Sequence, residues 1–157
     1  MIGLRELTLD DAEAVRRVYG PQSVRSLDRE PMDTVEARRY VADALSSAAR
    51  NPRTLHTLGL TANDDLLGVV KLHLDRPVAA VSYILRADSW GRGHATEGVR
   101  IALGLGLGRL GLPEIRARHH PDNVASGRVL LRAGFTRTGV RAGFMGYVIR
   151  RPSPSAC

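Results

Sequence analysis

A short loop with two glycines is the first stretch of this sequence that could do chemistry. Residues 90–95 read Trp-Gly-Arg-Gly-His-Ala, between an expected strand and an expected helix. Glycine lets the backbone approach an anion closely, and the free N–H groups and dipole of a helix start favour phosphate there. A glycine turn before a helix is often only a turn, and this stretch lacks the Gly-Lys-Ser/Thr of a Walker loop and the third glycine of a dinucleotide fingerprint. The predicted phosphate ligands are Gly91, Arg92, Gly93, His94 and Ala95.

A second motif follows the glycine loop, and the two motifs together are a more specific signal than either alone. Residues 121–135 read Pro-Asp-Asn-Val-Ala-Ser-Gly-Arg-Val-Leu-Leu-Arg-Ala-Gly-Phe, on the next expected helix. In this order and at this distance, the two motifs resemble the GNAT acyltransferase superfamily closely over 82–135. The resemblance is greatest to the branch that contains the bacterial ribosomal-protein N-terminal acetyltransferases, which is RimJ/RimL-like.

This resemblance implies both a fold and a co-substrate. The fold is an α/β mixed, twisted sheet flanked by helices, whose fourth and fifth strands splay apart so that a pantetheine arm can pair like an extra strand. The co-substrate is acetyl-CoA or another acyl-CoA, with its pyrophosphate on the backbone amides of 91–95. By the family's pattern, Asn123 lies near the pantetheine arm and Ser126 can hydrogen-bond the donor sulfur.

Acyl transfer from a thioester needs a neutral amine, a held oxyanion and a protonated or stabilised leaving thiolate. Many relatives use a tyrosine as the acid, but Leu130 stands at that position here. Ser126 lies one helical turn earlier, so we predict that it protonates the thiolate; the alternative is a serine that only satisfies the helix backbone. A backbone N–H around Leu85 or Arg86 is expected to polarise the thioester carbonyl.

The general base is left open by the sequence. Relatives often carry a glutamate shortly before Tyr83, where this chain has residues 79–81, Ala-Ala-Val. Histidine has a suitable ordinary pKa, so His73 and His120 are the predicted candidates, although a strand histidine is often structural. A nearly neutral acceptor amine would need no strong base. Asp75 and His119 are further possibilities. Tyr83 could line the acyl pocket or only pack, and we expect it to pack.

Two arginines on the second-motif helix are candidates for contacts outside the reaction centre. Arg128 and Arg132 could meet the 3′-phosphate of the coenzyme or a carrier protein, or could form only a solvated basic face.

Hydrophobic periodicity and turn residues predict the elements that must position these groups. Asp10 and Glu13 have capping-box spacing for a first helix that ends at Tyr19. Further helices are expected over 34–49, from the phosphate loop to about residue 110, and over 123–133, with a short helical piece in 23–33. Strands are expected at 2–9, 54–61, 66–74, 79–86, 114–119, 135–138 and 144–150. The change from hairpins to strand–helix–strand predicts a parallel crossover between 79–86 and 114–119.

The length and composition limit the number of domains, the compartment and the kinds of partner. The 157 residues fit one domain, expected at 1–151 with a frayed tail at 152–157, and the one cysteine allows no intrachain disulfide or cysteine-based metal site. The acidic start and short apolar stretches predict a cytoplasmic protein without a signal peptide or membrane span. Residues 79–157 hold 12 arginines against 4 acidic residues, which would attract phosphates or an acidic partner. The 4% aromatic content argues against nucleic acid.

The favoured function is an N-acyltransferase that moves an acetyl or other small acyl group from acyl-CoA to a small-molecule or peptide amine, without a metal. One alternative has the donor as a phosphopantetheine thioester on an acidic acyl carrier protein. Another is a non-catalytic acyl-CoA-binding module. A homodimer is plausible from the family alone.

Overall fold

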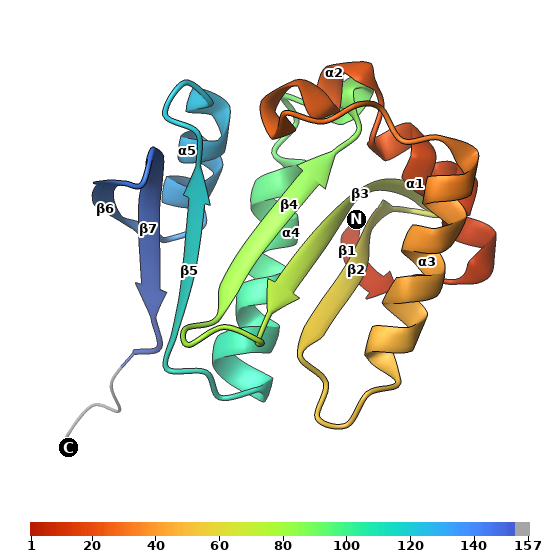
Figure 1. The fold of residues 1–157 in the computed structure, drawn as a ribbon. Helices are drawn as coiled ribbons and strands as arrows, with labels where there is room; N and C mark the ends of the chain where they lie inside the picture. The colour runs from red at the N-terminus through yellow and green to blue at the C-terminus, as the bar shows by residue number, and fades with distance from the viewer. Residues whose placement is uncertain (153–157) are drawn as a thin grey trace.

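A mixed sheet of seven strands forms the centre of the computed structural model, which describes residues 1–152 (Figure 1). The strand order is β1-β2-β3-β4-β5-β7-β6, and β4 and β5 are the parallel neighbours. The mixed sheet and the parallel crossover are therefore confirmed. The strands are β1 (Ile2–Glu6), β2 (Leu55–Ala62), β3 (Asp65–His73), β4 (Ala80–Leu85), β5 (Glu114–His119), β6 (Thr136–Arg141) and β7 (Phe144–Arg150).

Helices cover both faces of this sheet. The helices are α1 (Ala12–Val18), α2 (Pro21–Val24), α3 (Thr34–Ala48), α4 (His94–Leu103) and α5 (Val124–Arg132). In Figure 1, α4 and α5 lie behind the sheet, whereas α1 and α3 lie in front of its β2–β3 half and α2 lies over the end of β4. Within residues 1–152, none of the helices has the length and apolar character needed to cross a bilayer.

Alternation along the strands builds a separate core on each face. Val70 and Leu72 of β3 and Ile115 of β5 are at most 1% exposed and pack in one cluster with Val99 of α4. Each such fully buried aliphatic side chain contributes about 1.5–3 kcal/mol to folding. Residues of α1 and α3 pack in the second cluster, with Leu66 and Ile84 on the opposite face.

The sheet opens between its two parallel strands. β4 and β5 pair at a single position, Ala80 with Arg116, near their amino ends. β4 pairs with β3 over its whole length, and β5 likewise with β7. Beyond the single pair, β4 and β5 diverge toward their carboxyl ends, as Figure 1 shows. The splay that the resemblance implies is thus present.

The first strand and helix differ from the sequence expectation. β1 ends at Glu6, short of residue 9, and a 3₁₀ turn at Leu9–Asp11 precedes α1. The capping box joins Thr8 and Asp11, so the expected box of Asp10 and Glu13 is wrong. Thr8 is extended, and the Asp11 carboxylate accepts its N–H at 2.6 Å, which turns the chain out of the strand.

The expected helix to residue 110 changes type near its end. α4 stops at Leu103, and Gly104–Arg109 continues as a π-helical segment. A Cβ on Gly106 would lie 2.6 Å from the Ile115 Cδ1 atom, so this glycine lets the segment approach β5 closely. The expected tail at 152–157 lies, apart from Pro152, outside the described residues.

Candidate active site

The glycine loop places open backbone at the start of α4. Gly91 and Gly93 have φ of 77° and 78°, a left-handed conformation that favours glycine. A Cβ at either position would meet nothing within 4 Å, so the space above the loop is open. Gly93 is the N-cap and no side chain caps the helix, which leaves the first N–H groups of α4 without the intrahelical partners that later residues have. The loop can therefore hold a phosphate through its backbone.

The start of α5 brings Ser126 and Tyr83 together across the opening. The Tyr83 hydroxyl of β4 donates to the Ser126 Oγ atom at 3.0 Å. Burial raises the pKa of Tyr83, so its phenol stays protonated and able to donate. Asn123 caps α5, and its Oδ1 atom accepts the Ser126 N–H at 3.3 Å. Ser126 thus has its own hydroxyl hydrogen free to donate elsewhere.

The end of β4 offers one of the two predicted backbone donors. The Arg86 N–H donates to the Leu67 carbonyl at 2.7 Å, and the Arg86 side chain bonds Asp65 and Asp88. Arg86 is therefore wrong as a donor to the thioester, because its N–H is already paired with β3. Leu85 and Gly68 are register partners, and N–H groups alternate in direction along a strand, so the Leu85 N–H points away from β3 toward the opening.

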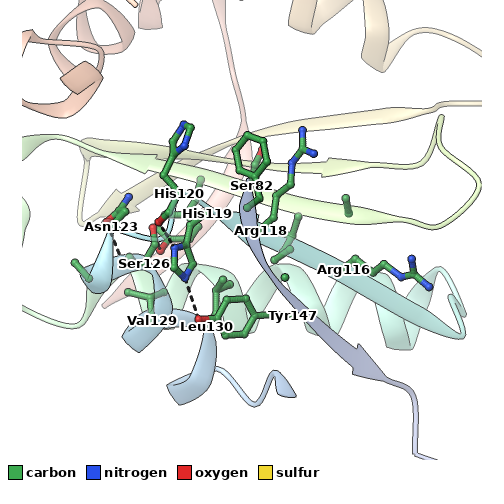
Figure 2. A pocket seen from close by; sticks show the side chains of 18 of the residues that line it. Ser82, Arg116, Arg118, His119, His120, Asn123, Ser126, Val129, Leu130 and Tyr147 are labelled. Carbon is green, nitrogen blue, oxygen red and sulfur yellow. Dashed lines mark hydrogen bonds between the residues drawn. The ribbon is translucent and has the colours of Figure 1, made fainter. Parts of the chain in front are cut away.

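A second pair of polar side chains lies beneath α5. The His119 Nδ1 atom contacts the His120 carbonyl at 2.6 Å, and a carbonyl only accepts, so Nδ1 carries the hydrogen. The Nε2 atom then accepts from the Tyr147 hydroxyl at 2.9 Å (Figure 2). With both ring nitrogens in use, His119 serves structure rather than proton transfer.

The two predicted base candidates lie at opposite ends of the opening. His73 pairs in register with Ala80, at the closed end, and its Nε2 atom is 3.0 Å from the Ser82 Oγ atom. Burial lowers the pKa of His73, which favours its neutral form. His120 follows the carboxyl end of β5, at the open end, where its ring lies 4.8 Å from the Phe144 ring.

One cleft connects these groups. Its volume is about 1900 Å³, larger than the roughly 300–1,000 Å³ of a pocket for one small ligand. Its lining includes Gly91, Gly93, His94 and Ala95 of the loop, the catalytic candidates Ser126, His73 and His120, and Leu85, Asn123, Arg128 and Arg132. The predicted ligand Arg92 is exposed on the loop and is not among the lining residues.

The split sheet, with a glycine loop that leads from β4 into α4, is the architecture of the GNAT fold. Residues 2–136 match the family model described as an acetyltransferase (GNAT) domain. The chain therefore belongs to the GNAT acetyltransferase family and is an N-acyltransferase, as the sequence motifs indicate.

Individual relatives agree with this placement. The chain is 28% identical over 148 residues to the uncharacterized N-acetyltransferase YoaA of Bacillus subtilis (strain 168), covering 90% of this chain and 83% of that protein. Two solved structures share the fold. They are a GNAT-family acetyltransferase of Bacillus anthracis (TM-score 0.79, 17% identity, 96% and 95% of the two chains) and Mycobacterium smegmatis RimJ in complex with CoA-disulfide (0.78, 18%, 95% and 81%).

The sequence did not predict the place of some residues in the cleft. Tyr83 was expected only to pack, yet it bonds Ser126. The partnership depends on the splay, which carries residues from two non-adjacent elements to one point. Arg116 and Arg118 of β5 were also missed, and their alternation with Ile115 and Ala117 was the available signal that they share one face.

Proposed function

We propose that this enzyme transfers an acetyl or other small acyl group from acyl-CoA to an amine by direct attack. The observation that carries the proposal is the opening between β4 and β5, with the glycine loop at the end of one strand and Ser126 near the end of the other. The relative RimJ, solved in complex with CoA-disulfide, supports the choice of donor.

The proposed orientation of the donor follows from where the loop, the arginines and Ser126 lie. Its pyrophosphate would lie on the backbone amides of 91–95, where the α4 dipole favours negative charge. Arg128 and Arg132 line the cleft from α5 and are suited to the 3′-phosphate. The pantetheine arm would then run between β4 and β5, next to Asn123, and bring the thioester to Ser126.

The chemistry follows from the groups around the thioester. The amine nitrogen attacks the carbonyl carbon, and the negative charge that develops on its oxygen is stabilised by the Leu85 N–H. The tetrahedral species collapses, the C–S bond breaks, and Ser126 gives its hydroxyl proton to the thiolate. Tyr83, hydrogen-bonded to Ser126, can restore that proton. The amide keeps one N–H, and the proton lost from nitrogen passes to a base or to solvent.

His120 fits the role of base better than His73. Leu85 lies five residues beyond Ala80 along β4, or about 16 Å at roughly 3.3 Å per residue. His73 sits beside Ala80 at the closed end, away from the proposed oxyanion site. His120 lies at the open end, between the carboxyl end of β5 and the start of α5.

The first experiment separates donor binding from turnover. Calorimetric titration with acetyl-CoA, beside acetyl-pantetheine, should show clear binding of the coenzyme and much weaker binding of the truncated arm. Ser126→Ala should bind acetyl-CoA as the wild type does but lower kcat by about 100-fold, the lower range for a general acid. Ser82→Ala is the matched control, because Ser82 also lines the cleft but lies toward its closed end, and its kcat should stay near wild type.

Each alternative has its own outcome. Binding of a phosphopantetheine-loaded carrier protein without binding of acetyl-CoA would overturn the coenzyme as donor. Binding of acetyl-CoA without turnover of any amine would make the protein a binding module. Unchanged turnover in Ser126→Ala would remove Ser126 from the mechanism.

A further inference from the structure

The outer face of β5 carries a row of basic side chains. Ile115 and Ala117 are buried against the α4–α5 side, so Arg116, Arg118 and His120 project from the opposite face. Figure 2 shows Arg118 and His120 on one side of β5 and Ser126 with Tyr147 on the other. The donor's phosphate loop belongs to the α4 side, so this opposite face is open to the acceptor.

Phe144 fixes the central arginine of this row. The Arg118 Cζ atom lies 4.3 Å from the centroid of the Phe144 ring, and the His120 ring lies 4.8 Å from the same ring. A guanidinium stacked on a ring keeps the N–H donors at its edge free for a carboxylate or a phosphate. An anion held by Arg118 would therefore lie close to His120, the proposed base.

The neighbouring strands leave open space near Arg118 at one of two glycines. Arg118 pairs in register with Gly146 of β7, and Gly146 pairs with Gly139 of β6. A Cβ on Gly139 would meet nothing within 4 Å, whereas a Cβ on Gly146 would lie 2.7 Å from the Thr138 Oγ1 atom, so the open space is at Gly139 and Thr138 covers Gly146. Thr138, Gly139, Arg141 and Gly146 all line the cleft.

The charge of the whole cleft has one sign. Among residues 1–152, its lining contains no aspartate or glutamate but eight arginines: Arg25, Arg76, Arg116, Arg118, Arg128, Arg132, Arg141 and Arg150. Two acidic residues lie at its margins. Glu114 lies 3.4 Å from both Arg116 and Arg150, and an Asp28 oxygen lies 3.7 Å from His120 Nε2. Within the described chain, Arg118 has no carboxylate within 4.0 Å.

We propose that the acceptor is an α-amine flanked by anionic groups, held by Arg118 against the acceptor face of β5. This deepens the proposed function and rests on it. A cationic acceptor such as a polyamine would meet arginines in the lining of the cleft, with carboxylates only at its margins, at Asp28 and Glu114. An α-amine, with an ordinary pKa of about 7.7–8.0 against about 10.4 for lysine, is partly neutral near pH 7.5 and needs no carboxylate base. The shared chemistry is a carboxylate or phosphate close to a weakly basic amine.

The test compares acceptors that differ only in charge. Acetylation kinetics are measured with the peptides Ser-Asp-Asp-Ala-Ala, Ser-Asn-Asn-Ala-Ala and Ser-Arg-Arg-Ala-Ala, all with blocked carboxyl termini. Free aspartate and O-phosphoserine show whether a small anionic amine suffices. We expect kcat/KM to be at least about tenfold higher for the acidic peptide than for its amide isostere, as charge-assisted hydrogen bonds imply.

Arg118→Gln should remove most of this preference by lowering kcat/KM for the acidic peptide about 10- to 100-fold, with little effect on the amide peptide. Arg137→Gln is the matched control, because Arg137 is exposed on β6 but does not line the cleft. Equal or better rates with the amide or arginine peptide would overturn the proposal. So would an equal loss for all peptides in Arg118→Gln.

A binding measurement tests the anionic acceptor site without depending on the proposed transferase activity. Fluorescence anisotropy is measured with the labelled acidic peptide and the CoA-loaded protein. Binding that weakens about tenfold or more in Arg118→Gln, without turnover, would support the anionic site while the transferase reaction fails. Binding that is absent, or equal in both proteins, would overturn the site.

Discussion

Tyr83 and Ser126 form a hydrogen-bonded hydroxyl pair, in which the tyrosine donates to the serine. Burial raises the pKa of Tyr83 and keeps its phenol protonated, so in the proposed mechanism the tyrosine would act as a proton reserve behind Ser126. Tyr83→Phe keeps the ring and its packing but removes the hydroxyl. We expect kcat to fall about tenfold, the value of one neutral hydrogen bond, with the KM for acetyl-CoA unchanged.

Steady-state kinetics across pH, with the double variant Tyr83→Phe/Ser126→Ala, would check this relation. Because the two hydroxyls act in series, the double variant should be no slower than Ser126→Ala alone. Multiplied losses in the double variant would show that the two residues act independently.

At the residue scale, the sequence motifs are sufficient to predict residues that line one cleft. Asn123, Ser126 and the glycine loop lie in contiguous motifs, so their neighbours in sequence are their neighbours in space. Tyr83 could not be assigned in this way, because its contact with Ser126 depends on how far β4 and β5 diverge. That divergence is a property of the sheet and of no local pattern.

At the element scale, α5 packs against the sheet through Gly127, where there is no room for a side chain. A Cβ on Gly127 would lie 2.8 Å from the Tyr147 hydroxyl and 3.1 Å from His119 Nε2. Gly127→Ala should lower the free energy of unfolding by about 1–3 kcal/mol, as overpacking does. Gly104→Ala is the control, because nothing lies within 4 Å of its Cβ position and its φ of −59° is helical.

Urea denaturation of both variants measures the difference. Gly104→Ala should be neutral or more stable by about 0.5–1 kcal/mol, since alanine is the better helix former. A Gly127→Ala protein as stable as the wild type would show that α5 can shift without cost.

The link between β1 and α1 should make stability depend on pH. Two Arg5 nitrogens donate to Asp11 at 2.8 and 2.9 Å, and this pairing, with the Thr8 N–H, lowers the pKa of Asp11. A carboxyl with a lowered folded pKa stabilises the fold above its unfolded pKa of about 3.9, and that contribution is lost as pH falls further.

Asp11→Asn should therefore cost about 1–2 kcal/mol at pH 7 and much less near pH 2. Thermal or urea unfolding of wild type and variant at the two pH values checks the sign. A difference that stays constant between them would mean that the charge of Asp11 has no part in joining β1 to α1.

Most elements could be predicted because periodicity and turn residues fix them locally. Strand β3, expected at 66–74, is observed at Asp65–His73, and α3 ends at Ala48 instead of 49. The exceptions depend on contacts between elements. Gly104–Arg109 adopts a π-helix where Gly106 packs on Ile115, and β1 ends early where Thr8 and Asp11 form a capping box.

At the scale of the whole molecule, the excess of positive charge and the candidate site residues both lie mainly in the second half of the chain. Residues 79–157 hold 12 of the 23 basic residues but only 4 of the 16 acidic ones, and they supply both the glycine loop at 91–95 and β5. A positive cleft attracts an anionic donor and an anionic acceptor alike, which raises the rate at which each is captured. This excess was visible in the sequence, but the side of the sheet that it occupies was not.

The single backbone pair between β4 and β5 has a consequence for the mechanics of the molecule. Beyond Ala80 and Arg116, the two halves of the sheet are held together by the helices behind them and by no ladder between the strands. A donor whose pantetheine arm lies between β4 and β5 would contact both strands and so connect the two halves of the sheet. A ligand that binds only the folded form stabilises it by mass action, so the loaded enzyme should be stiffer and harder to melt than the empty one. In this enzyme the coenzyme would be both a reactant and, while it stays bound, the missing strand of the sheet.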